Sequence, residues 1–229
     1  MIRRLLSVFV ALLVAASLTA QNAAPADDSA ARLERLLTAM GGRDAWARIV
    51  SYEIRATHHE ANRAPYANTI WNDFAWPAVR IEARGPGLDV VRAIDGDRGW
   101  RQRDGGEVVA FTPEQVREEK RWWEANIYRT LHRLARRDPE LSVRAVGASR
   151  LEVWRADGVR LNWVELNTAG EPLRFGTWDN DQGTVFGPLV QQGPVTCAKW
   201  GTNASGTWRY EVIELLVSER PSAANFRQP

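Results

Sequence analysis

Apolar side chains recur at every second position from residue 51 to residue 111, and this period limits what the chain can fold into. Tyr52, Ile54 and Ala56 share one parity, and Val79, Ile81 and Ala83 repeat the pattern further along. A period of two is that of a β-strand with one buried face. Turn-forming glycine motifs separate the runs, at residues 85–87, 95–96 and 104–106. The region is therefore predicted to be a meander of antiparallel strands.

The same pattern returns after residue 150. Strands are predicted at 151–155 and 159–166, on either side of the hairpin turn Asp157-Gly158, and then at 173–178, 196–200 and 208–217. In the last of these strands the apolar parity slips by one residue, which predicts a β-bulge near Val212. In total the sequence predicts about nine to eleven antiparallel strands, and a sheet of that size curls strongly.

Two helices are predicted, one before the strands and one between them. The first is predicted to begin at Asp28 or Ser29 and to end at Gly41-Gly42, followed by a short turn that carries Trp46. The second has Thr112 as its cap, Pro113 at its first position and Gln115 completing a capping box. Its apolar stripe predicts one continuous helix that ends before Pro139 and lies in the hollow of the curled sheet: Val116, Trp123, Ile127, Leu131 and Leu134.

The N-terminus has the pattern of a secretory signal peptide. Arg3 and Arg4 precede a short apolar run and then small residues up to Ala20. The run is too short to cross a bilayer, which needs about 20 residues, although an uncleaved anchor is the alternative. The predicted organisation is a signal peptide at 1–20, a flexible leader at 21–27 and a single domain at 28–229. The mature protein is expected in the periplasm, without a stable membrane span.

Charge and cysteine usage narrow the classes of partner. The chain has 30 basic and 28 acidic residues, and loss of the signal with its two arginines leaves 28 of each. A chain balanced in this way is not expected to bind nucleic acid. Cys197 is the only cysteine, so no internal disulfide is possible, and a buried, inert thiol is expected. The eleven tryptophans exceed what a core of this size needs and hint at a binding surface.

The order of several short motifs resembles the LolA-like superfamily of periplasmic lipoprotein carriers and the uncharacterised exported proteins similar to them. These motifs are Gly41-Gly42-Arg43-Asp44-Ala45-Trp46, the hairpin Asp95-Gly96 with Gly99-Trp100, the segment Leu161–Leu166 followed by Gly170-Glu171-Pro172-Leu173-Arg174, and Phe226 with Pro229 near the end. The resemblance covers most of residues 30–229. It implies a half-open barrel with helices on its concave side, around an apolar cavity that shields acyl chains in the carriers.

Together these observations predict a mainly β (α+β) fold. The expected form is a curled antiparallel half-barrel of about nine to eleven strands, with two or three helices on its concave side. Fold alone does not fix activity, since members of the superfamily include enzymes and envelope sensors.

No motif points to catalysis or to a cofactor. His58-His59-Glu60 contains metal-ligand types, but neighbours on a strand point to opposite faces. Asp95-Gly96-Asp97 and Asp179-Asn180-Asp181 lack the glutamate that closes a calcium loop, since Gly106 and Val190 stand at the twelfth position. Glu152 and Glu165 could face each other across the 157–158 hairpin, as a carboxylate pair would. We therefore predict no catalytic residue, no metal and no cofactor, and an enzyme is the less favoured alternative.

The sequence favours burial of an apolar or amphipathic ligand, such as a lipid or a lipoprotein acyl chain, in the hollow of the sheet. The alternatives are an enzyme acting on an envelope lipid or small molecule in the same cavity, and a structural envelope protein whose hollow is filled. Strand parity and helical periodicity select the expected lining, with Trp122 at its margin or packed under a strand edge: Ile70, Phe74, Trp76, Trp122, Trp123, Ile127, Val159, Leu161 and Trp163.

Overall fold

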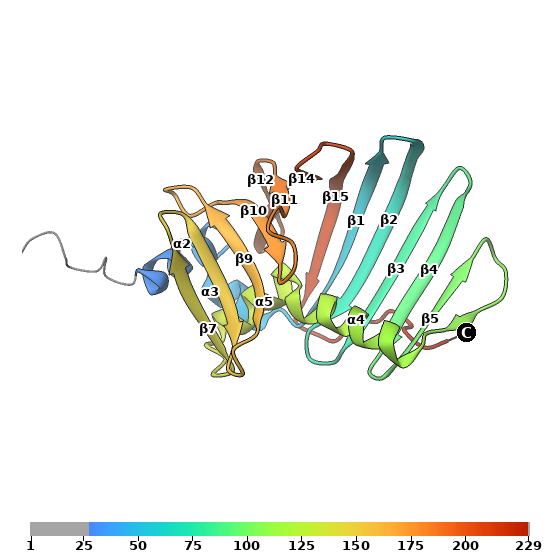
Figure 1. The fold of residues 1–229 in the computed structure, drawn as a ribbon, viewed down its shortest axis with the longest axis horizontal. Coiled ribbons are helices and arrows are strands. Elements are labelled where there is room, and N and C mark those ends of the chain that lie inside the picture. Colours follow the sequence, from blue (N-terminus) through green and yellow to red (C-terminus); the bar gives the residue numbers. More distant parts are fainter. Residues whose placement is uncertain (1–27, 229) are drawn as a thin grey trace, which may run out of the picture.

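The computed structural model describes residues 28–228, so the predicted signal peptide and leader lie outside the described residues. One antiparallel sheet of thirteen strands runs through the whole length of the protein (Figure 1). Its order is β6-β5-β4-β3-β2-β1-β15-β14-β11-β10-β9-β8-β7, so the first and last strands of the chain are neighbours at its centre. The predicted mainly β fold with a curled antiparallel sheet is confirmed.

The N-terminal half of the sheet is a meander whose register keeps the predicted parity. It consists of β1 (Ser51–Glu60), β2 (Arg63–Asp73), β3 (Ala78–Gly85), β4 (Leu88–Asp95), β5 (Arg98–Arg103) and β6 (Val109–Ala110). Each pair is antiparallel and joined by a short turn, as the glycine motifs indicated.

The C-terminal half has more strands than expected. It consists of β7 (Leu141–Val146), β8 (Arg150–Arg155), β9 (Arg160–Leu166), β10 (Pro172–Thr177), β11 (Thr184–Phe186), β14 (Trp200–Asn203) and β15 (Trp208–Ser218). A separate hairpin, β12 (Leu189–Gln192) and β13 (Val195–Ala198), packs against β15. The described part of the chain thus has fifteen strands, whereas nine to eleven were predicted. Several of the additional strands have only two to four residues, which is too short to show a period in the sequence.

The predicted bulge in the last strand is present. Ile54 pairs with Leu215 and Ala56 pairs with Val212, so one additional residue of β15 is accommodated opposite Arg55 and Ala56. The extra residue, Ile213, points its side chain into solvent. The bulge restores the apolar parity of β15 on both sides of the slip.

Two N-terminal helices, α2 (Ser29–Ala39) and α3 (Arg43–Arg48), end and begin at the predicted glycines. Gly41 has a φ of 113°, and a Cβ atom there would lie 2.7 Å from the Cα of Val195 in β13. The helix stop therefore needs glycine for two reasons, its backbone conformation and the close approach of β13. Asp28 is the residue before α2, but its carboxylate receives the guanidinium of Arg32 instead of capping a backbone amide.

The long mid-chain helix is divided in two. The capping box is confirmed, because Gln115 N donates to Thr112 Oγ1 over 3.3 Å and Thr112 N donates to Gln115 Oε1 over 2.9 Å. The helix nevertheless breaks at Asn126, giving α4 (Pro113–Ala125) and α5 (Ile127–Ala135). Asn126 has extended backbone, and its side-chain oxygen accepts from the amides of Tyr128 and Arg129. It is thus the cap of a second helix that the unbroken apolar stripe concealed.

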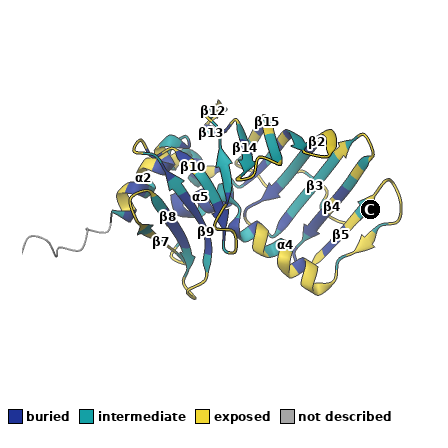
Figure 2. Cartoon of the chain, turned by 45° about the horizontal axis from the view of Figure 1, so that its top comes forward, coloured by how far each residue is buried: buried dark blue, intermediate teal, exposed yellow. Residues whose placement is uncertain are grey.

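We call the face of the sheet that carries α4 and α5 the inner face and the opposite one the outer face. The main core lies on the inner face, between α2, α3 and α5 and the centre of the sheet: Leu36, Leu37, Met40, Trp46, Ile49, Tyr52, Ile54, Phe74, Leu131, Ala135, Leu151, Val164, Leu166, Val195, Cys197 and Leu215. In Figure 2, α4 is largely exposed where it crosses the N-terminal half, whereas the strands behind it are mainly buried or intermediate. A second, small cluster of Val91, Ala93 and Trp100 lies on the outer face.

The parity predicted for β9 is wrong. Asn162 and Val164 face α5, because the Asn162 amide donates to the carbonyl of Ala125 over 2.9 Å and to Thr130 Oγ1 over 2.8 Å. Leu161 and Trp163 therefore point to the outer face. There the indole of Trp163 donates to the carbonyl of Asn180, in a loop that covers this part of the sheet.

Candidate functional site

Four of the nine residues predicted to line a ligand hollow are core residues: Phe74, Trp123, Leu161 and Trp163. Their polar atoms are already paired. The Trp123 indole donates to the carbonyl of Asp73 over 2.6 Å, and its ring lies under the guanidinium of Arg129, 3.7 Å away. Ile127 is half-buried against the main core. These residues do not share one surface, since Leu161 and Trp163 lie on the outer face.

Three others are largely exposed and lie on different elements of the fold. Trp76 is in the turn after β2, with its indole hydrogen-bonded to the carboxylate of Asp95. Val159 is in the hairpin before β9. Trp122 projects from α4 and packs on Trp178, with ring centroids 5.1 Å apart. Trp122 therefore packs on a half-buried aromatic partner, which is neither of the two environments predicted for it.

The space beneath α5 is filled. The side chains of Leu36, Ile127, Leu131, Val153 and Val164 converge there and leave a cavity of only about 10 Å³. A cavity of this size has room for a single water molecule at most. The part of the inner face that lies under α2, α3 and α5 is therefore closed to a ligand in this structure.

The inner face of the N-terminal half remains more open, and its register places apolar residues in line across six strands. We call the first line the isoleucine row. Leu215 of β15 pairs with Ile54, which pairs with Ile70, which pairs with Ile81. The row then ends in two arginines, Arg92 of β4 and Arg101 of β5.

A second line, the alanine row, runs beside the first. It consists of Val212, Ala56, Asn68, Ala83, Val90 and, at its end, Arg103. In both rows the end near β15 is covered by the β12–β13 hairpin, whose Val195 and Cys197 share the core of Ile54 and Leu215. Further out, the apolar side chains are only half-buried: Ile70, Ile81, Ala83 and Val90. The two rows therefore form a half-exposed apolar floor on this part of the inner face.

The arginines at the end of the rows differ in their pairing. Arg92 forms an ion pair with Glu119 of α4, 2.5 Å apart, which fixes the helix to the sheet. Burial raises the pKa of Glu119, and Arg92 opposes that shift. Arg101 and Arg103 are exposed, and neither has an ion pair among residues 28–228. The edge of the apolar floor therefore presents two unpaired cations on one side.

Aromatic side chains close the upper end of β1, β2 and β15 on the same face. The imidazole of His58 lies among the rings of Tyr66, Trp208 and Tyr210, with centroids 5.2, 5.5 and 6.0 Å away. Burial lowers the pKa of His58 to about 4, against the opposing charge of Glu60. His58 is therefore neutral at physiological pH. These aromatic side chains cover the inner face at this end of β1, β2 and β15. The charged edge of that face is therefore the one with Arg101 and Arg103, on β5.

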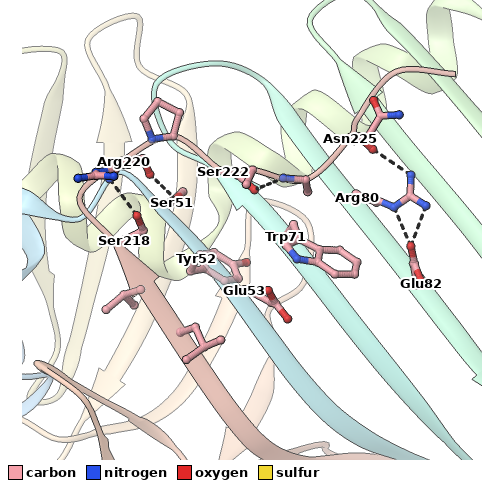
Figure 3. Close-up of a pocket in the computed structure, with 15 residues that line it drawn as sticks. Ser51, Tyr52, Glu53, Trp71, Arg80, Glu82, Ser218, Arg220, Ser222 and Asn225 are labelled. Atoms are coloured by element: carbon pink, nitrogen blue, oxygen red, sulfur yellow. Dashed lines mark hydrogen bonds and ion pairs between the residues drawn. The ribbon is translucent and has the colours of Figure 1, made fainter. Parts of the chain in front are cut away.

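A larger pocket lies on the outer face, beneath the C-terminal tail (Figure 3). It has a volume of about 720 Å³ and is bounded by β1, β2, β3, β15 and residues 220–225. The indole of Trp71 lies between Glu53 and the ion pair of Arg80 with Glu82. The carboxylates are balanced by neighbouring arginines, since Glu53 and Glu214 both pair with Arg55.

The residues considered for catalysis do not come together. His58 faces the inner side of β1, and His59 lines a small pocket with Arg209 and Glu211 on the other side. Glu152 pairs across the strands with Trp163, and Glu165 pairs with Arg150, so the two carboxylates do not face each other. Cys197 is buried, as predicted, and burial raises its pKa to about 11. Within residues 28–228 no three histidine, cysteine, aspartate or glutamate side chains are grouped as metal ligands.

The sequence analysis identified some residues of the isoleucine and alanine rows but not their alignment across the strands. The parity of Val79, Ile81 and Ala83 was visible, and so was that of Ile70. The arginines were missed because Trp100-Arg101-Gln102-Arg103 shows only that two arginines share a parity. The alignment of that pair with Ile81 and Val90 depends on the cross-strand register, which a local period cannot give.

No protein-family model matches the chain, and no curated protein matches its sequence. No helix within residues 28–228 has the length and apolar character to cross a membrane.

Among solved structures, the protein is similar to a LolA superfamily protein from Nitrosomonas europaea, with 10% identity, a TM-score of 0.40, and 84% of this chain and 94% of that chain covered. It is also similar to an uncharacterised conserved protein from Thermus thermophilus, with 12% identity, a TM-score of 0.34, and 88% and 94% covered. A third similar structure is the MucA/MucB complex of Pseudomonas aeruginosa, with 17% identity, a TM-score of 0.31, and 88% and 61% covered. One solved member of the LolA superfamily, which the sequence motifs resemble, is thus among the structures similar to this one.

Proposed function

We propose that this protein is an exported binding protein for an anionic amphipathic ligand. The proposal rests on one observation: two apolar rows cross the inner face, and each ends in an unpaired arginine at the same edge. An acyl chain would lie along Ile70, Ile81 and Val90. A carboxylate or phosphate at its end would meet Arg101 and Arg103.

The apolar floor and the two arginines contribute differently to the free energy of binding. Contact with the floor removes apolar area from water, at about 25 cal/mol per Å², and supplies most of the gross affinity. Ordering of the ligand reduces that gain considerably. The arginines contribute less, because an exposed ion pair is worth about 0.2–1 kcal/mol. Their main effect is to select an anionic head group and to fix the direction in which the chain lies.

Binding of a fluorescent fatty-acid analogue, compared with binding of its uncharged methyl ester, tests this proposal. The wild-type protein is expected to bind the acid more tightly. Reversal of both charges in Arg101→Glu/Arg103→Glu should weaken binding of the acid at least about tenfold and leave the ester almost unaffected. Ile81→Asp should weaken the binding of both probes, because it places a charge on the apolar floor.

Arg98→Glu is the matched control. Arg98 lies on the same strand and is exposed, but it has the parity of the outer face. If Arg98→Glu weakens binding of the acid as much as the double variant does, the selectivity comes from net charge. The proposed head-group position would then be wrong. A wild-type protein that binds neither probe would instead favour a structural role.

A further inference from the structure

The last ten described residues form a tail that crosses the outer face in an irregular, extended path. Residues 219–228 leave β15, pass over β1, β2 and β3 (Figure 3) and reach the Trp100 indole of β5. Side chains at the two ends of the tail form ion pairs, Glu219 with Arg48 and Arg227 with Asp95, and four hydrogen bonds from the sheet hold its main chain. Ser51 Oγ donates to the carbonyl of Arg220 over 2.7 Å, and Asp73 Oδ2 accepts from the amide of Ser222 over 3.1 Å. Arg80 Nη1 and the Trp100 indole each donate over 2.9 Å, to the carbonyls of Asn225 and Phe226.

All four bonds go to main-chain atoms of the tail. We call the residues that make them the outer-face strip: Ser51, Asp73, Arg80 and Trp100. Because every polypeptide has the same amides and carbonyls, the strip recognises an extended backbone rather than a particular set of side chains. A different segment in the same conformation could make the same four bonds.

The strip is formed by the sheet and does not depend on the tail for its geometry. The Asp73 carboxylate is buried and is held by the amides of Ala75 and Trp76, which leaves its other oxygen directed at the tail. Trp100 is 3% exposed, packs with Val91 and Ala93, and lies under the guanidinium of Arg80. These exposed fractions are those of the protein with the tail in place, so the tail itself contributes to the burial of the strip.

The tail fits the strip incompletely. Its side chains alternate, so Ser222, Ala224 and Phe226 are half-buried towards the sheet, and the residues between them are exposed. Ala224 lies over the pocket of about 720 Å³ that contains Trp71 and Leu216. A methyl group fills little of that volume. A segment with a larger apolar side chain at this position would bury more surface against Trp71.

From these observations we propose that the outer-face strip is a docking surface for an extended peptide segment of another protein. The segment would carry a large apolar residue where the tail has Ala224. The chain's own tail occupies the strip until such a partner replaces it. This surface is on the face opposite the isoleucine and alanine rows and is independent of the proposed ligand site.

Peptide binding in trans provides the test. A fluorescein-labelled peptide of residues 219–228, and the same peptide with Ala224→Leu, are titrated against the full chain and against a chain lacking residues 219–229. The shortened chain should bind both peptides, the Ala224→Leu peptide about tenfold more tightly. The full chain should bind each at least about tenfold more weakly, because its tail competes. Absence of binding to a folded shortened chain, or equal binding by the two chains, would overturn the proposal.

Two neighbouring arginines supply the matched control. Arg80→Gln should weaken peptide binding to the shortened chain about tenfold, since it removes a charged donor to the backbone. Arg84→Gln should have no effect, because Arg84 shares the strand and the partner Glu82 but makes no contact with the tail. Equal effects of the two variants would show that the peptide lies elsewhere.

A second version of the experiment keeps the tail if the shortened chain does not fold. A protease site inserted after Ser218 allows the tail to be cut in the folded protein, and native mass spectrometry then follows its release. The Ala224→Leu peptide should displace the cut tail, and a tail that cannot be displaced would contradict the proposal. A dimer of the full chain with exchanged tails would show that a second copy is the occupant, which would also overturn it.

Discussion

At the scale of single residues, arginine has a structural role that the composition concealed. The chain has only two lysines, Lys120 and Lys199, against 28 arginines. Six of the eleven tryptophans have a guanidinium over the ring, within 3.7 to 5.4 Å of its centre: Trp100, Trp123, Trp154, Trp163, Trp178 and Trp200. Such contacts occur about once per 70–80 residues in proteins. The planar guanidinium therefore acts here as a flat cover for aromatic rings, which an ammonium group cannot do equally well.

Arg129 shows the largest effect that we expect from these contacts. Its guanidinium is buried, lies 3.7 Å from the centre of the Trp123 ring and donates to the carbonyl of Phe74. Burial lowers its pKa to about 10. Arg129→Lys should destabilise the protein by about 1–2 kcal/mol, because the stack and the fixed donor are both lost. Arg121→Lys, over the more exposed Trp178, is the control in urea denaturation, and an equal loss there would disprove the role of burial.

His58 makes stability depend on pH. Its folded pKa, about 4, lies below the ordinary value of 6.5, because burial among aromatic rings disfavours the charged imidazole. Unfolding allows the imidazole to take up a proton, so the contribution of His58 is present above pH 6.5 and is lost as the pH falls towards 4. The expected loss across that window is on the order of 1–3 kcal/mol.

The variant His58→Phe isolates this contribution. His132, whose pKa is also lowered by burial, adds to the same pH dependence, so the informative quantity is the difference between wild type and variant. Thermal denaturation at pH 7 and pH 4.5 should show a smaller decrease in Tm for the variant. An unchanged decrease would mean that His58 is charged in the folded protein.

At the scale of elements, the start of α4 follows from sequence and its end does not. The capping box at Thr112 was visible because its three residues are adjacent in the chain. Thr112→Ala should cost about 1 kcal/mol, since the amide of Gln115 loses its acceptor. Denaturation with urea measures this loss, and Thr112→Ser should retain most of the stability. An unchanged midpoint for Thr112→Ala would show that the cap contributes nothing.

The break at Asn126 and the parity of β9 have one physical origin. Both depend on a polar side chain that is satisfied only after the fold has formed. Asn126 bonds to the hydroxyl of Tyr52 and to the first amides of α5, and Asn162 bonds to the carbonyl that the break leaves free at Ala125. In the sequence, Asn162 indicates an exposed position and Trp163 a buried inner one. The hydrogen bonds across the core reverse both assignments.

At the scale of the whole molecule, the sequence predicts the class of fold well because alternation and turn motifs are local. The curled sheet, the placing of helices on one face and the bulge in β15 all follow from such signals. The set of residues that forms the apolar floor of the inner face does not, because it depends on which strands become neighbours. The isoleucine row joins residues from six strands, and only the complete register aligns them.

The proposed export predicts the mass of the mature protein, because the signal peptide is removed. The pattern from Arg3 to Ala20 should lead to cleavage, so the protein recovered from the periplasm should lack about 20 residues. Intact-mass spectrometry measures this directly. Replacement of Leu12 by Arg should interrupt the apolar run and leave the full-length precursor in the cytoplasm. A periplasmic protein that still begins at Met1 would contradict the prediction.

The pairing of β1 with β15 has a consequence for the order in which the molecule is assembled. The two halves of the sheet meet along a seam between β1 and β15. β15 is 11 residues long. That seam closes a loop of about 150 residues, and contacts so distant in sequence make folding slow. The halves therefore remain separate until the final strand has been synthesised and is free to pair. If the chain is exported unfolded, as proposed, the seam between β1 and β15 would form only after the last strand has crossed the membrane.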